Sequence, residues 1–158
     1  MFKKYLVRNF VKNIDKDFKV SFIDTFEVDI PEEHIYITFK HDKELDQMYD
    51  DFLYEQFGKR YNIFLLSLLH EVGHIMTYED ELEEGRDIIY GLLKLDYEEG
   101  KSDVAEYNHK YFLIPMEFEA TSWGVWYYEN HKEQCNKLIK RLGMWFPQPI
   151  WYFIKIII

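Results

Sequence analysis

Two histidines and a glutamate form the part of the sequence with the clearest chemical potential. Residues 70–74 read His-Glu-Val-Gly-His, the pattern H-E-x-x-H. On a helix, positions i and i+4 lie on the same face, so the imidazoles of His70 and His74 can converge on one metal ion. This pattern is typical of a Zn²⁺ site, with Glu71 beside the metal as general base. We therefore expect a zinc-dependent hydrolase with Glu71 as its catalytic residue.

The residues before the motif support burial of this site. Residues 63–69 are apolar except for Ser67, which predicts a buried helix. Two histidines and a glutamate on such a helix are costly without a partner. A metal ion is the partner we expect, and buried hydrogen bonds to the histidines are the alternative.

A catalytic zinc normally has three protein ligands and one open position. Glu117 and Glu119 are the downstream candidates, and being two apart on a helix they point in different directions, so only one can bind. The small residues 120–122 would let this helix approach the metal helix closely. On that ground we favour Glu119 as the third ligand, and Glu117 is the alternative.

Two segments resemble the signatures of the ImmA/IrrE-type metallopeptidases. Residues 60–74, Arg-Tyr-Asn-Ile-Phe-Leu-Leu-Ser-Leu-Leu-His-Glu-Val-Gly-His, are similar to the family's active helix, and residues 117–124, Glu-Phe-Glu-Ala-Thr-Ser-Trp-Gly, to its second signature. The resemblance implies a zincin-like fold, zinc bound by His70, His74 and Glu119, Glu71 as base, and a protein or peptide substrate. It also suggests a distant, stand-alone member encoded by a phage or mobile element.

Two other functions fit the motif. One is a non-catalytic, zinc-containing module that binds a protein, and the other is a hydrolase of a non-peptide amide. For a peptidase, Tyr107, His109 and Tyr127 are candidates to stabilise the oxyanion, and Asp87 is a candidate to orient a ligand histidine. The aromatic residues 123 and 126–128 would pack in the core or line a substrate groove.

Charge and cysteine content exclude several classes. The 158-residue chain has 19 Lys+Arg against 29 Asp+Glu, a net charge of −10. That balance argues against a protein whose principal role is to bind nucleic acid or an anionic membrane, and we expect no direct nucleic-acid partner. The single cysteine, Cys135, excludes an internal disulfide and fits a cytoplasmic protein; we interpret it as a buried thiol.

The periodicity predicts an α+β fold that is mainly helical. Alternating residues 18–40 predict two or three short antiparallel strands near the N-terminus. Apolar spacing predicts helices over 2–14, 42–57, 62–76, 79–95 and 103–113, and a long one over 115–142 that breaks near residues 130–131. The acidic residues 79–84 are expected as a solvated helix start. No linker interrupts the chain, so residues 1–158 are expected to form a single metallopeptidase-like domain.

The two ends of the chain are unusual. The first helix is expected to pack on the body, with a membrane-surface helix as the alternative. The apolar tail, residues 144–158, is too short and too interrupted by proline to form a transmembrane segment. We expect it to join the core or to form a contact between copies of the chain, with a membrane contact as the alternative.

Overall fold

The computed structural model describes residues 1–144, apart from the side chains of residues 80 and 81. Residues 145–158, and with them the expected role of the apolar tail, lie outside the described part. Seven helices and a three-stranded sheet make up the described chain, which confirms the mainly helical α+β fold. Within residues 1–144, no helix combines the length and the apolar character needed to cross a bilayer.

The centre of the fold is a pair of helices, α3 (Ile63–Met76) and α6 (Pro115–Asn130). They approach closely because small residues face each other. A Cβ atom on Gly73 would overlap the backbone carbonyl of Ala120, and a Cβ on Gly124 would lie 3.2 Å from the Cβ of Leu69. This close packing holds the H-E-x-x-H motif against the start of α6.

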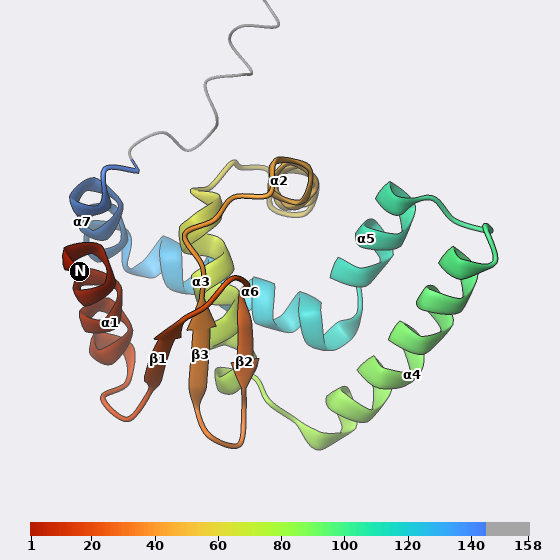
Figure 1. Cartoon of the computed structure of the whole chain (residues 1–158), viewed down its shortest axis with the longest axis horizontal. Helices are drawn as coiled ribbons and strands as arrows, with labels where there is room; N and C mark the ends of the chain where they lie inside the picture. The colour runs from red at the N-terminus through yellow and green to blue at the C-terminus, as the bar shows by residue number, and fades with distance from the viewer. Residues whose placement is uncertain (145–158) are drawn as a thin grey trace, which may run out of the picture.

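A small sheet lies against α3 (Figure 1). It contains β1 (Lys19–Phe22), β2 (Glu27–Asp29) and β3 (His34–Ile37) in the order β1-β3-β2. The pair β2–β3 is antiparallel, but β1 pairs with β3 in parallel. The expectation of a purely antiparallel sheet is therefore wrong. Alternation identifies a strand but not its neighbour, and the connection through residues 23–26 carries the chain past β3 to the far edge.

Helices α1 (Phe2–Ile14) and α7 (Lys132–Leu142) pack side by side at one end of the molecule (Figure 1). Their buried faces join α3 and the sheet in the main hydrophobic core. The members contributed by these two helices are Leu6, Val7, Phe10, Val11, Cys135, Leu138, Ile139 and Leu142. The first helix therefore packs on the body, as its spacing predicts.

Helix α2 (Lys43–Phe57) packs with α3 and α6 around a second cluster that includes Phe52, Leu53 and Leu66. It ends at Gly58, which has a φ of 70°, a conformation that favours glycine. Helices α4 (Asp80–Glu98) and α5 (Val104–Phe112) form a hairpin at the opposite end from α1 and α7 (Figure 1). This hairpin contacts α6 and connects the two halves of the site.

Candidate metal centre

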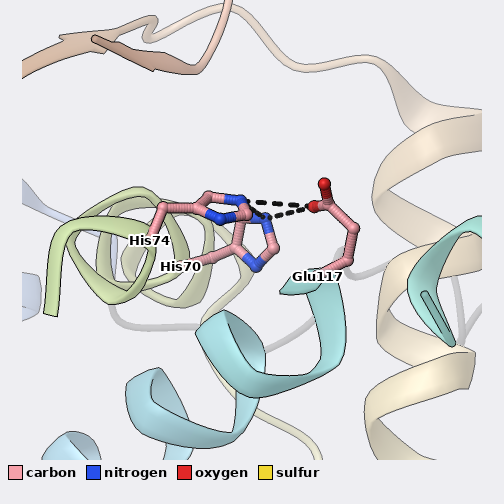
Figure 2. Close-up of side chains that lie close together, drawn as sticks. All are labelled: His70, His74 and Glu117. Carbon is pink, nitrogen blue, oxygen red and sulfur yellow. Dashed lines mark hydrogen bonds and ion pairs between the residues drawn. The ribbon is translucent and has the colours of Figure 1, made fainter. Parts of the chain in front are cut away.

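The two histidines of the motif project from α3 toward the first turn of α6 (Figure 2). Helix α3 begins after Asn62, whose side chain accepts a hydrogen bond from the backbone N–H of Leu65 at 3.0 Å. This cap satisfies one of the free N–H groups at the helix start and fixes where the helix begins. The side chains of His70 and His74 are 13 % and 6 % exposed, so both lie in a largely dry environment.

Glu117 completes a three-residue cluster with these histidines. Its Oε2 atom lies 3.2 Å from Nε2 of His70 and 3.2 Å from Nε2 of His74, and the two Nε2 atoms are 3.0 Å apart. Pro115 occupies the first position of α6, where its missing N–H has no cost, and places Glu117 in the first turn. The Glu117 side chain is 1 % exposed.

These distances match the requirements of a tetrahedral cation site. Ligands about 2.0–2.1 Å from a zinc ion at tetrahedral angles are about 3.3 Å from one another. The three separations observed here are 3.0, 3.2 and 3.2 Å. The buried group His70, His74 and Glu117 could therefore hold a metal ion with little movement of its side chains.

Glu119, the third ligand favoured from the sequence, does not reach this cluster. It is exposed, whereas Glu117 is buried. The small residues that allow close approach, Ala120 and Gly124, lie three and seven positions after Glu117 and therefore share its helix face. The small residues thus mark the face of α6 that carries Glu117, and the structure brings Glu117, the alternative from the sequence, to the two histidines.

Electrostatics in the cluster favour a neutral His70 and an ionised Glu117. Burial lowers the pKa of His70. Burial would raise the pKa of Glu117, but its interactions with the two histidines outweigh that effect and hold the pKa well below its usual range. A neutral imidazole and a carboxylate are the protonation states that bind a cation.

Glu71 lies beside the cluster on α3 and is 8 % exposed. Burial raises the pKa of Glu71 to about 8, with further contributions from the charges of Glu117 and of Glu27 on β2. Glu27 influences Glu71 because β2 packs against α3. The carboxyl group of Glu71 thus sits between the histidine cluster and the edge of the sheet.

The second nitrogen of His70 contacts a hydroxyl group. Its Nδ1 lies 2.9 Å from Oγ1 of Thr121, which is fully buried on α6. If Nε2 bound a cation, Nδ1 would carry the proton and donate a hydrogen bond to Oγ1 of Thr121, which would fix the orientation of the ring. Asp87, the sequence-based candidate for this role, instead accepts hydrogen bonds from Arg86 at the surface. The structure thus pairs Asp87, on α4, with Arg86 and not with His70 or His74.

Tyr111, near the end of α5, interacts with the cluster and was not identified from the sequence. Burial raises the pKa of its hydroxyl, and the charges of Glu117 and Glu71 raise it further. Arg86 also interacts with Tyr111 and Glu117. Tyr111 carries no motif signal, and only the fold of the α4–α5 hairpin brings it to the site.

The three sequence candidates for oxyanion stabilisation lie elsewhere. Tyr107 packs on Tyr97 with ring centroids 5.4 Å apart, and His109 lies 3.8 Å from Glu55. Tyr127 is buried and contacts Phe10 edge-on at 6.3 Å. These contacts are with residues outside the group of His70, His74 and Glu117.

Two further expectations concern aromatic residues and the cysteine. Trp123 stacks on Tyr127 at 5.2 Å and packs against the core, and Trp126 is 54 % exposed. The aromatic residues of α6 therefore serve mainly to pack that helix. Cys135 is fully buried, and burial raises its pKa to about 12, so it is a buried thiol as expected.

Comparisons of this chain with protein-family models, with curated proteins and with solved structures found no match.

Proposed function

We propose that this protein is a zinc-dependent metallopeptidase. The observation that carries the proposal is the position of Glu117 Oε2, 3.2 Å from both Nε2 atoms of the H-E-x-x-H motif. The resemblance of residues 60–74 and 117–124 to the signatures of the ImmA/IrrE-type metallopeptidases supports it. The resemblance assigns the third ligand to Glu119, and we assign it to Glu117 from these distances.

The donor set favours zinc over other divalent ions. Two imidazole nitrogens and one carboxylate oxygen are typical of catalytic zinc, whereas Mg²⁺ and Ca²⁺ prefer oxygen ligands alone. Three protein ligands leave a fourth position for water or substrate. A purely structural zinc site would normally use all four positions for protein groups.

A zinc ion held by His70, His74 and Glu117 would polarise the substrate carbonyl and make a water molecule more acidic. The charge of that cation would lower the pKa of Glu71, and the ionised carboxylate accepts a proton from the water as its oxygen attacks the carbonyl carbon. When the C–N bond breaks, Glu71 returns the proton to the leaving amine. The products are one carboxylic acid and one amine, and Glu71 is ready for another cycle.

The sheet supports a peptide rather than a small amide as substrate. Strand β2 is an edge strand, and it packs against α3 next to the motif. An edge strand has unpaired backbone N–H and C=O groups with which an extended peptide can pair. The charge of Glu27 on β2 contributes to the raised pKa of Glu71, which supports a substrate position beside the proposed base.

The test combines metal content with hydrolysis by the full chain. We expect one zinc per chain by elemental analysis, and its loss in His70→Ala/His74→Ala. With a mixed peptide library and unfolded casein as probes, we expect cleavage that is abolished in Glu71→Gln while that variant retains zinc. Equal metal in the wild type and the double variant would overturn the metal site. Retained zinc without cleavage of any probe, together with a biological effect that survives Glu71→Gln, would favour the non-catalytic binding module.

A further inference from the structure

The positive charge of this acidic protein is concentrated in two helices. Helices α1 and α7 carry eight basic residues and one acidic residue, Glu133. Their net charge of +7 contrasts with the −10 of the whole chain. The basic residues are Lys3, Lys4, Arg8, Lys12, Lys132, Lys137, Lys140 and Arg141.

These helices carry their charges at the same end of the molecule. They pack side by side (Figure 1) and bury their apolar faces in one core, which leaves their polar residues at the surface of this end. The guanidinium group of Arg141 on α7 lies over the ring of Phe2 on α1 at 5.8 Å, which connects the two faces. We call the exposed surface of α1 and α7 the basic face.

The basic face also exposes large aromatic side chains. Phe2 is 60 % exposed and Tyr5 is 61 % exposed, and both lie on α1 among its lysines. Lys12 and Lys137 are exposed and form no ion pair with any residue of the described part of the chain. Charges without acidic partners and largely exposed aromatic side chains are available to an external partner.

The sequence after α7 has the same character. Residues 145–158 include Trp145, Phe146, Trp151, Tyr152 and Phe153, together with Lys155, and contain no Asp or Glu. Aromatic residues combined with lysine are typical of sequences that contact the boundary between lipid headgroups and acyl chains. This segment follows directly from the helix that supplies half of the basic face.

We propose that the basic face docks this protein on the surface of an anionic phospholipid bilayer. Clustered lysines and arginines are attracted to acidic headgroups, and Phe2 and Tyr5 can enter the headgroup region. A nucleic acid would use the same charges but would give no role to the apolar residues that accompany them. The acidic remainder of the chain does not prevent docking, because charges more than about 8–10 Å from the surface are screened at physiological salt.

Vesicle sedimentation with the full chain tests this proposal. We expect binding to vesicles of phosphatidylcholine mixed with phosphatidylglycerol, no binding to phosphatidylcholine alone, and weakening of the binding by added salt. The variant Lys12→Glu/Lys137→Glu should bind the anionic vesicles at least about tenfold more weakly than the wild type. Tyr5→Ser should weaken binding while leaving its salt dependence unchanged.

A matched control separates the basic face from net charge. Lys94→Glu/Lys101→Glu makes the same change in charge at the far end of the molecule, near the α4–α5 connection, and should bind like the wild type. Circular dichroism and thermal melting confirm that each variant is folded. The proposal would be overturned if the two double variants lost the same amount of vesicle binding, or if the protein did not bind the anionic vesicles. It would also be overturned by equal binding to both vesicle types, or by stronger binding to duplex DNA at the same salt.

Discussion

Gly73 on α3 and Ala120 on α6 lie so close that a β-carbon on Gly73 would overlap the Ala120 carbonyl group. The contact lies one residue before His74 and three residues after Glu117. The distance between the two helices at this point therefore determines the distance between the histidines and the carboxylate.

We expect Gly73→Ala to destabilise the protein by about 1–3 kcal/mol, because the new methyl group must push the helices apart. Alanine is a better helix former than glycine, so helix propensity alone predicts the opposite sign. Urea unfolding of the metal-free protein measures the effect. Gly91→Ala is the matched control, since nothing lies within 4 Å of its added Cβ, and it should stabilise by about 0.5–1 kcal/mol. Similar effects of the two substitutions would contradict the close contact.

The two glutamates of α6 should differ sharply in metal binding. Glu117→Gln removes the carboxylate at the cluster, and we expect the affinity for Zn²⁺ to fall by more than about 100-fold, beyond the loss typical of groups outside the ligand set. Glu119→Gln changes the same charge at an exposed position and should leave the affinity unchanged. Competition titration with a zinc indicator compares the two variants. A larger loss of zinc affinity in Glu119→Gln than in Glu117→Gln would instead identify Glu119 as the ligand.

Thr121 orients His70 through the 2.9 Å contact with Nδ1. Thr121→Val keeps the shape of the side chain but removes the hydroxyl, and we expect zinc affinity to fall by about 10–100-fold. Thr121→Ser should restore most of it, because the hydroxyl group is retained. A Val variant with unchanged affinity would show that His70 needs no partner at Nδ1.

Tyr111 is a candidate to assist the proposed reaction. Its hydroxyl interacts with both Glu117 and Glu71, and we expect it to donate a hydrogen bond to the substrate oxygen that becomes negative. Tyr111→Phe should lower kcat on the order of 100-fold with little change in KM or in zinc content. A loss of zinc in this variant would instead indicate that Tyr111 supports the ligand Glu117.

Alkaline pH should destabilise the protein through buried tyrosines. Tyr61 is 3 % exposed and donates a hydrogen bond to Glu129, and burial together with this carboxylate raises its pKa to about 12. The folded state holds this proton more tightly than the unfolded state, whose pKa is about 10. The stabilisation is therefore complete below about pH 10 and is lost as the pH rises toward 12.

Tyr61→Phe should reduce the fall in the free energy of unfolding at alkaline pH. Urea unfolding of the metal-free protein at several pH values measures this fall. Tyr5→Phe is a suitable control because Tyr5 is 61 % exposed, and it should decline like the wild type. If Tyr61→Phe and the wild type lose stability in parallel, deprotonation of Tyr61 does not drive the decline.

The helices could be predicted from sequence because their signals are local. Four local signals place the ends of these helices within a few residues: the apolar spacing, the Asn62 cap, Gly58 after α2 and Pro115 at the start of α6. The break between α6 and α7 also falls at the expected place, at Asn130 and His131. Pairing of β1 depends on contacts between distant residues, which alternation does not encode.

The metal site could be predicted only in part for the same reason. His70 and His74 belong to one helix, so their spacing alone brings them together. The choice of Glu117 needs the face of α6 that packs on α3, and Thr121 and Tyr111 need the positions of α6 and α5. The basic face was hidden because a net charge averages over the chain, whereas the fold separates α1 and α7 from the acidic helices.

All three residues of the candidate metal centre come from α3 and α6, and the α4–α5 hairpin is inserted in the chain between them. A bound ion would therefore act as a cross-link that closes the loop of residues 75–116, in the way that a disulfide closes a loop. Removal of the ion would release one constraint at both ends of this hairpin. Zinc supply would then control how readily cellular proteases cut the protein within α4 and α5.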